Sequence, residues 1–316
     1  MKVLEARAPG LLTTVQDLGR EGFGPWGVSP SGAADAVALR IGNRLVGNVE
    51  DTAALELTLV GGTFAFPDGA VIALAGSDFG ATLDGASLET WTSVAVRAGQ
   101  TLKLGATTSG ARCYLCVQGG IVVQEVLGSA ATHLLSGLGG FEGRTLCKGD
   151  VLRIANSKDA FRTFRQKRVS ARALARLTPR KILRVTSGPQ ATWFSPSACK
   201  ILYESGYRVT EESNRMGLRL AGPAISSDVG REMISEGVSL GAVQIPAGGQ
   251  PIILFVEQQT TGGYPKLANV ISADFHSLGQ LRPRDEVHFE QIEMEAARRL
   301  FCEQEELLAS EELIAE

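Results

Sequence analysis

The chain has 316 residues, 44% of them hydrophobic, which suffices for at least one full core and, at the usual domain size, for two domains. A formal net charge of -3 gives no field that would attract nucleic acid or an anionic membrane, and the apolar runs are too short to span a bilayer. Five cysteines are too few for a disulfide framework and suit a reducing compartment. Because no export signal is visible at the start, we expect a cytoplasmic protein that binds small molecules or other proteins.

Two polar, glycine-containing motifs occupy the first 35 residues. They contribute Gln16, Asp17 and Arg20 from the first, and Ser31 and Asp35 from the second. The second motif precedes an expected helix, whose N-terminus favours anions. These five residues form a second candidate site, and the alternative for Ser31 is a helix-capping role.

The first half is predicted to be rich in short strands, because glycine is abundant and aromatic residues make up only 6% of the chain. One helix is expected before these strands in the chain, since Ala34, Ala38, Ile41 and Leu45 recur at helical spacing before Gly47. The strand pattern that follows is typical of a barrel or a sandwich. The predicted strands are Val71 to Ala75, Ser93 to Val96, Thr101 to Leu104, Ala111 to Val117 and Val151 to Ile154.

A basic segment separates the two halves. We therefore predict a lobe over 1–157, a linker over 158–181, a second lobe over 182–290 and an amphipathic helix over 291–316. The alternative for the basic segment is a docking site for an acidic partner or for phosphates. The strands predicted in the second half are Ile182 to Val185, Lys200 to Tyr203, Tyr207 to Val209, Val243 to Ile245, Pro251 to Val256 and Val287 to Phe289.

Several common catalytic motifs are missing from the sequence. There is no Gly-Lys dipeptide and therefore no P-loop, and the three histidines show no metal-binding spacing. Cys113 and Cys116 have the spacing of a metal pair, but in a strand they point to opposite faces. With no GxSxG elbow, a serine triad is also disfavoured. No metal site is predicted.

The segment EQQTTGGYPK, Glu257 to Lys266, is the principal candidate site. It follows an apolar strand and places a carboxylate, amides, hydroxyls and an ammonium within ten positions. The Gly pair is expected to form an anion nest, with Lys266 as the counter-charge and Glu257 as an acid or base. The alternative is a solvated turn. The proposed catalytic residues are Glu257, Lys266 and Thr261, and the proposed binding residues are Gln259, Thr260, Gly262, Gly263 and Tyr264.

Two neighbouring motifs add candidates to this site. Glu236 and Gln244 lie in one motif, and a glutamine amide can pair reciprocally with a substrate amide. Asn214 and Arg215 lie in another, where a guanidinium can hold a carboxylate or a phosphate. A surface ion pair is the alternative for Arg215.

Taken together, these motifs resemble the allophanate hydrolase subunit 2 family, also known as a biotin-dependent carboxyltransferase family. The resemblance covers nearly the whole chain and is closest to the family members that serve 5-oxoprolinases. It implies a mainly β fold of two cyclophilin-like β-barrel lobes with short helices and a C-terminal helix. The matching segments are TVQDLGRxG from Thr14, GVSPSGAAD from Gly27, SNRMGLRLAG from Ser213, SEGVxxGAVQIP from Ser235, and QTTGGYPK from Gln259.

The resemblance also implies a function within a complex. The expected activity is ATP-dependent opening of 5-oxoproline to glutamate, together with a companion subunit of the subunit 1 type and a third subunit. ATP with Mg²⁺ would act in the complex, and the chain alone would be inactive. No Met-Lys pair suitable for biotin attachment occurs in the chain. The alternatives are carboxyl transfer from carboxybiotin to a urea-like amide, and a non-enzymatic antagonist of a kinase-inhibitor protein.

Three positions depart from the pattern that the family leads us to expect. Glu257 stands in place of Asp, Ala34 in place of Met, and Arg284 in place of Gly. The first of these adds a methylene group at a candidate catalytic carboxylate.

Overall fold

A computed structural model describes residues 2–155, 164–227 and 233–315. The chain forms two compact units. Unit 1 consists of Met1–Arg20, Ser31–Leu177 and Leu307–Glu316, and unit 2 consists of Glu21–Pro30 and Thr178–Glu306. The mainly β class predicted from the sequence is confirmed.

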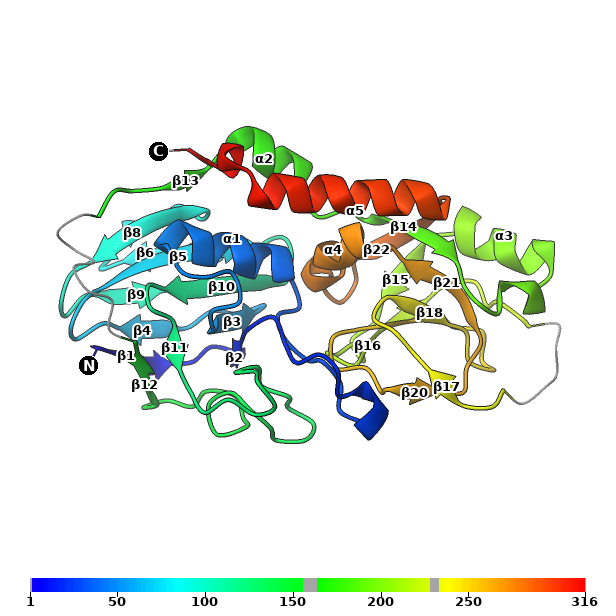
Figure 1. The fold of residues 1–316 in the computed structure, drawn as a ribbon, viewed down its shortest axis with the longest axis horizontal. Helices are drawn as coiled ribbons and strands as arrows, with labels where there is room; N and C mark the ends of the chain where they lie inside the picture. The colour runs from blue at the N-terminus through cyan, green and yellow to red at the C-terminus, as the bar shows by residue number, and fades with distance from the viewer. Residues whose placement is uncertain (1, 156–163, 228–232, 316) are drawn as a thin grey trace. The chain divides into compact units, whose positions relative to one another are not determined.

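Unit 1 contains two seven-stranded sheets (Figure 1). A barrel or a sandwich was expected for the first half, and the strand order shows two separate sheets. In order across the first sheet, the strands are β11 (Ile121–Val122), β12 (Val151–Ile154), β1 (Lys2–Ala8), β4 (Thr63–Ala65), β9 (Thr101–Lys103), β6 (Thr82–Leu83) and β7 (Ala86–Ser87). Across the second they are β2 (Leu12–Gln16), β3 (Ala54–Thr58), β10 (Arg112–Val117), β5 (Ala70–Gly76), β8 (Thr92–Val96), β13 (Arg168–Val169) and β23 (Ile314–Ala315).

The core of unit 1 lies between these sheets, because alternate residues of each strand point to one face. Leu4 of β1 and Phe64 of β4 meet Leu55 of β3 and Leu115 of β10 in one buried cluster. On β10 the alternation also separates the two cysteines, as predicted: Cys113 joins this cluster, and Cys116 joins the cluster on the other face. Burial raises the pKa of the Cys113 thiol to about 12, so it stays protonated.

Helix α1 (Ala36–Val46) covers the outer face of the second sheet. It begins where the Asp35 side chain accepts a hydrogen bond from the Ala38 amide, and it ends at Gly47, whose φ of 77° suits glycine. Gly42 faces β10 so closely that an added Cβ would lie 2.6 Å from Cys116 Sγ. The helix predicted from Ala34, Ala38, Ile41 and Leu45 is confirmed. Unit 1 also contains α2 (Ala171–Arg176) and the 3-10 turn η4 (Glu311–Leu313).

Unit 2 contains a closed barrel of seven strands (Figure 1). Around the barrel these are β14 (Ile182–Ser187), β21 (Lys266–Val270), β18 (Ala242–Gln244), β19 (Ile252–Leu254), β16 (Gly217–Ala221), β15 (Tyr207–Val209) and β22 (Glu286–Gln291). A two-stranded ribbon pairs β17 (Glu236–Gly237) with β20 (Thr261–Gly262). The helices and 3-10 turns are η1 (Gly24–Trp26), η2 (Ala191–Trp193), α3 (Pro196–Glu204), η3 (Ser272–Asp274), α4 (Phe275–Gln280) and α5 (Met294–Ala309), whose residues from Leu307 onward belong to unit 1.

One predicted strand of unit 2 is wrong. Lys200 to Tyr203 lies within α3. The residue before this helix, Ser195, caps it by accepting a hydrogen bond from the Ala198 amide, and Pro196 lies in the first turn. A short apolar run fits a strand or a helix equally well, and the cap decides between them. The other strands predicted in this half are found within one or two residues of their expected ends.

The basic segment predicted as a linker lies partly outside the described residues. Its described part contains β13, which joins the second sheet of unit 1, and α2, which is capped by Ser170. Within α2, Ala173 is buried in the cluster that also contains residues 307 and 308. This part of the segment therefore contributes to the core of unit 1.

Candidate functional site

A buried charged group of the principal candidate segment is Lys266, at the start of β21. Its side chain is only 4% exposed, and its ammonium forms an ion pair with the carboxylate of Glu236, which is 46% exposed. The Lys266 ammonium, followed by the Gln190 amide, holds the pKa of the Glu236 carboxyl below its usual range. A buried cation thus meets a solvent-facing carboxylate at the β17–β20 ribbon.

Gln190, which the sequence analysis did not single out, is the third member of this cluster. Its Nε2 donates to Glu236 Oε1 at 2.9 Å, and its Oε1 accepts from the Lys266 amide at 3.1 Å. The Gln190 backbone amide also donates to the Lys266 carbonyl at 3.2 Å. Gly188 allows this close approach, since a Cβ there would lie 2.3 Å from the Lys266 carbonyl oxygen. The Gln190 side chain is therefore oriented by the Lys266 backbone.

Gln244 lies opposite Lys266 in the pairing of β18 with β21. Its side chain is 1% exposed, and its Nε2 has no hydrogen-bond partner among the described residues. An added Cβ on Gly262 would lie 2.6 Å from this nitrogen, so the absence of a side chain at Gly262 makes room for the amide. An unpaired buried amide is costly, which suggests that a ligand or a water satisfies it.

Arg215 and Glu257 form a second ion pair, with Nε and Oε1 2.5 Å apart. Both side chains are buried, at 6% and 3% exposure, and the Glu257 amide also donates to the Arg215 carbonyl at 2.8 Å. Removing one partner of such a pair leaves an uncompensated buried charge. The two candidate catalytic residues Glu257 and Lys266 thus belong to different ion pairs.

The remaining residues of the principal segment differ in exposure. Gln259, Thr261 and Tyr264 are exposed, whereas Gln258, which was not predicted, is buried and has an Oε1 without a partner in the described part of the chain. The predicted anion nest is wrong. Gly262 pairs with Glu236 in the ribbon, and neither Gly262 nor Gly263 has the positive φ that a nest requires.

Two further predicted residues make local backbone contacts. Asn214 Oδ1 accepts from the Met216 amide at 2.8 Å and so closes the turn before β16. Thr260 accepts from the Val238 amide through its carbonyl at 3.1 Å, which extends the ribbon. Both residues shape the loops on which the cluster sits.

The second candidate site, in unit 1, is a set of loop anchors. Asp17 accepts hydrogen bonds from the Gly19 amide at 2.8 Å, Ser129 Oγ at 2.7 Å and the Ala130 amide at 2.6 Å. Arg20 donates to the Ala131 carbonyl at 2.5 Å. Both charged side chains therefore hold the loop between β11 and β12.

The other residues of this candidate site also make internal contacts. Gln16 Nε2 and Ser31 Oγ donate to the Thr132 carbonyl at 3.1 and 2.8 Å. Asp35, rather than Ser31, caps α1, so the capping alternative for Ser31 is wrong. Glu56 accepts from the Ala34 amide at 2.9 Å and from the Tyr114 hydroxyl at 2.7 Å. Together these residues connect β2, α1 and the β11–β12 loop.

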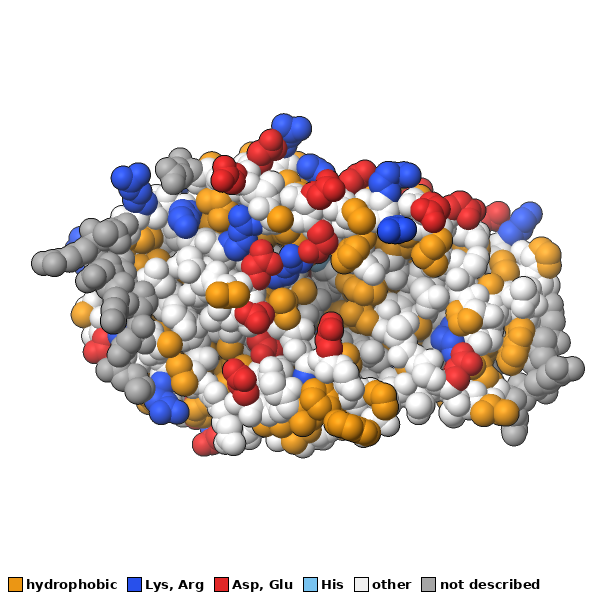
Figure 2. Space-filling model, in the orientation of Figure 1, with side chains coloured by type: hydrophobic (Ala, Val, Ile, Leu, Met, Phe, Trp, Pro, Cys, Tyr) orange, Lys and Arg blue, Asp and Glu red, His pale blue; other side chains and the backbone are white. Residues whose placement is uncertain are grey.

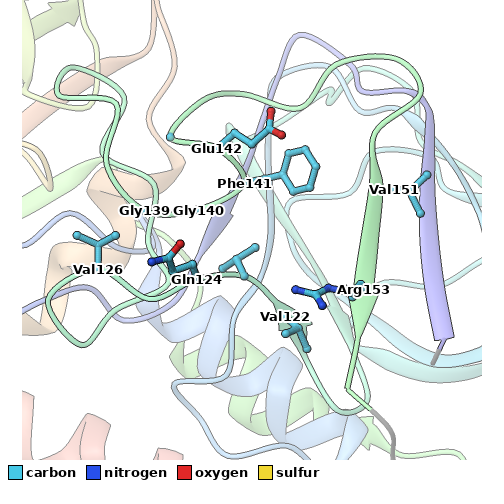
Figure 3. Close-up of a pocket in the computed structure, with 11 residues that line it drawn as sticks. Val122, Gln124, Val126, Gly139, Gly140, Phe141, Glu142, Val151 and Arg153 are labelled. Carbon is cyan, nitrogen blue, oxygen red and sulfur yellow. The ribbon is translucent and has the colours of Figure 1, made fainter.

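The loop held by Asp17 and Arg20 lines a pocket of about 390 Å³ in unit 1 (Figure 3). Arg153 extends from β12 toward the part of the loop that carries Gln124, and valines form much of the wall (Figure 3). None of the five predicted residues lines this pocket; Arg20 instead donates to the carbonyl of Val126, a lining residue, at 3.3 Å.

Acidic and basic side chains are interspersed over the face shown in Figure 2. Among residues 2–155, 164–227 and 233–315, no three histidine, cysteine or acidic side chains are grouped as a metal site would require. In the same described ranges, no helix is both long and apolar enough to cross a bilayer.

Comparison with known proteins places the chain in a family. Residues 26–291 match the model of the carboxyltransferase domain, subdomains A and B. The chain belongs to this carboxyltransferase domain family. It is 40% identical over 297 residues to a 5-oxoprolinase subunit of Escherichia coli strain K12, covering 94% of this chain and 93% of that protein. The family resemblance predicted from the motifs is thereby confirmed.

Larger carboxyltransferase-domain proteins are also similar. Urea amidolyase of Saccharomyces cerevisiae is 34% identical over 314 residues, which is 94% of this chain but 17% of that protein. The crystal structure of the K. lactis urea amidolyase matches with a TM-score of 0.90 and 31% identity, over 99% of this chain and 21% of that chain. The fold is thus shared with one section of a much longer polypeptide.

Lys266, Glu236, Gln190 and Gln244 form the unit 2 cluster. Sequence reasoning named all of these residues except Gln190, and it did not name the buried Gln258. Gln190 follows a predicted strand and a Gly-Pro turn, which is the same kind of signal that marked the segment after β19. Gln258 and Gln259 are adjacent amides, and the sequence does not show which of the two is buried.

Proposed function

We propose that this chain is the carboxyltransferase-domain subunit of a 5-oxoprolinase, and that the unit 2 cluster binds the small cyclic amide. The complex would add one water to 5-oxoproline, cleave its lactam C–N bond and release glutamate, with ATP hydrolysis supplying the driving force. A companion subunit of the subunit 1 type and a third subunit would complete the enzyme. The name and full-length similarity of the E. coli relative support this proposal.

The observation that carries the proposal is the grouping of buried polar side chains at one place in the barrel. Lys266 provides a positive charge for an anionic group, while Gln244, opposite Lys266 in the pairing of β18 with β21, is a buried amide with an unsatisfied Nε2 that suits an amide ligand. Preorganised donors of this kind are effective because they need no reorientation when the substrate binds. No residue of this chain is assigned to ATP or Mg²⁺.

Reconstitution tests the proposal. The purified chain is expected to be inactive alone, and addition of the two companion subunits should give glutamate release from 5-oxoproline that requires ATP. Glutamate release by the chain alone would refute the need for partners. An inactive complex of all three folded subunits would refute the proposed reaction.

Carboxyl transfer is the second candidate function, because the urea amidolyase structure shares the fold over almost the whole chain. The same amides would then bind the ureido oxygen and nitrogens of a urea-like substrate. Transfer of labelled carboxylate from carboxybiotin to urea, without glutamate release from 5-oxoproline, would favour this function over the first.

A further inference from the structure

A preorganised pair of hydrogen-bond donors lies at the β17–β20 ribbon. The Lys266 ammonium and Gln190 Nε2 point at the same atom, Oε1 of Glu236. The orientation of the Gln190 amide is fixed, because its oxygen already accepts from the Lys266 backbone amide at 3.1 Å. Its NH₂ group must therefore face outward beside the ammonium. The pair has the geometry of a carboxylate receptor.

The carboxylate that occupies this receptor is unusual among the ion pairs of unit 2. Glu236 is 46% exposed over a lysine that is 4% exposed, whereas Arg215 and Glu257 are both almost fully buried. Glu236 is held by a ribbon of two residue pairs, with its backbone outside the barrel. The side chain can swing into solvent without opening the core, which is not true of Glu257.

Charge also favours an exchange. If Glu236 left without a replacement, the buried Lys266 ammonium would lose its counter-ion at a cost in free energy. An incoming carboxylate removes that cost. It could also give one oxygen to each donor, whereas Glu236 presents a single oxygen to both. The site is therefore suited to receive an anion in place of Glu236.

We infer that Lys266 and Gln190 form a carboxylate-binding subsite, that Glu236 fills it in the absence of substrate, and that the carboxylate of the substrate displaces Glu236. This inference rests on the proposed function for the identity of the substrate, since 5-oxoproline carries a carboxylate beside its lactam. It assigns Gln190 a binding role and Glu236 the role of an internal competitor. It also distinguishes an acidic lactam from urea, which has no carboxylate.

Equilibrium binding to the full chain tests the inference, with 5-oxoproline as the titrant in calorimetry. Glu236→Gln should bind 5-oxoproline on the order of tenfold more tightly than the wild type, because the competing carboxylate is gone. Gln190→Glu keeps an acceptor for the Lys266 amide but replaces the donor with a second carboxylate, so binding should weaken. Opposite effects from two neighbouring substitutions are not expected from loss of structure.

Matched controls define the outcome. Glu211→Gln alters an exposed pair with Arg284, and Gln291→Glu alters an exposed glutamine, so neither should change the affinity. For 2-pyrrolidone, which lacks the carboxylate, Glu236→Gln should bind as the wild type does. The inference is overturned if 5-oxoproline binds no more tightly to Glu236→Gln than to the wild type, if it binds neither protein, or if 2-pyrrolidone gains equally.

Kinetics of the reconstituted complex separate this inference from the proposed function. An inactive wild-type complex would refute the function and leave the binding result to decide the subsite. An active complex in which Glu236→Gln leaves the KM for 5-oxoproline unchanged would refute the subsite alone. The expected result is an active wild type and a lowered KM in Glu236→Gln.

Discussion

The two polar clusters of this molecule look alike in sequence and differ in structure. The buried carboxylate of Asp17 accepts hydrogen bonds from two backbone amides and a hydroxyl. These donors belong to the loops that Asp17 holds in place. Around Lys266, a buried cation is bound by a carboxylate that solvent can reach. The Asp17 carboxylate is thus fixed by its surroundings, whereas the partner of Lys266 is open to exchange under the proposal above.

The largest effect is expected from Lys266→Met in the reconstituted complex. Loss of the buried positive charge should lower kcat/KM for 5-oxoproline by about 100-fold or more, in the range found when a preorganised donor is removed. The unfolding midpoint should fall little, because the Glu236 left behind faces solvent. Lys181→Met is the control, since Lys181 is exposed in its pair with Asp285. Near-normal kcat/KM in Lys266→Met would place the site elsewhere.

Asp17→Asn should show the reverse pattern, a loss of stability without a change in the kinetics of the folded protein. The substitution places an NH₂ group among three donors, and we expect a loss of about 2–3 kcal/mol in the free energy of unfolding. Urea unfolding followed by circular dichroism measures it.

Asp78→Asn is the control for this loss, because Asp78 accepts from the Gly80 amide at 2.8 Å in an exposed turn. If Asp17→Asn keeps its stability and instead lowers kcat/KM, the unit 1 cluster is a functional site after all, and the contrast between the two clusters fails.

Two adjacent glycines allow a finer test of the unit 2 cluster. Gly262→Ala would place a Cβ 2.6 Å from Gln244 Nε2, whereas at Gly263 the nearest atoms would lie at 3.4 and 3.5 Å, an ordinary contact. We expect Gly262→Ala to displace the Gln244 amide and lower kcat/KM by roughly tenfold, the effect of about 1.4 kcal/mol. Gly263→Ala should stay close to the wild type. Equal effects in the two variants would argue against a role for Gln244.

How much of the fold and of the candidate site could be predicted depended on the distance in sequence between the interacting residues. The mainly β fold, α1 and Lys266 follow from local patterns and from the family motifs. The contacts of Lys266 do not: Glu236 was a candidate from its own motif, but its ion pair with Lys266 and the part played by Gln190 were not predicted. These two residues are 30 and 76 residues away from Lys266, and only the closure of the barrel and the β17–β20 pairing bring them together.

Local ambiguity explains the other differences. Lys200 to Tyr203 is apolar enough for a strand, but the Ser195 cap makes it part of a helix. The Gly262–Gly263 pair suggested a nest because glycine permits positive φ, but pairing with β17 holds Gly262 in a strand. Glycine permits a conformation without imposing it.

The smallest expected effect concerns the acid dependence of stability at Glu236. Lys266 and Gln190 lower the pKa of this carboxyl in the folded protein, so its ion pair stabilises the fold at a pH above the pKa of an unfolded glutamate. That contribution is lost as the pH falls through the lower, folded-state pKa. Glu236→Gln should therefore be less stable than the wild type at neutral pH, and the difference in urea midpoint should shrink as the solution is acidified.

Glu211→Gln, measured at neutral pH, gives the cost of removing one exposed carboxylate of unit 2. A Glu236→Gln midpoint that differs from the wild type equally at neutral and acid pH would mean that the carboxylate does not bind Lys266 in solution. Lys266 would then be a buried cation with another partner, and the distinction between an exchangeable and a fixed partner, which separates the two clusters, would no longer hold.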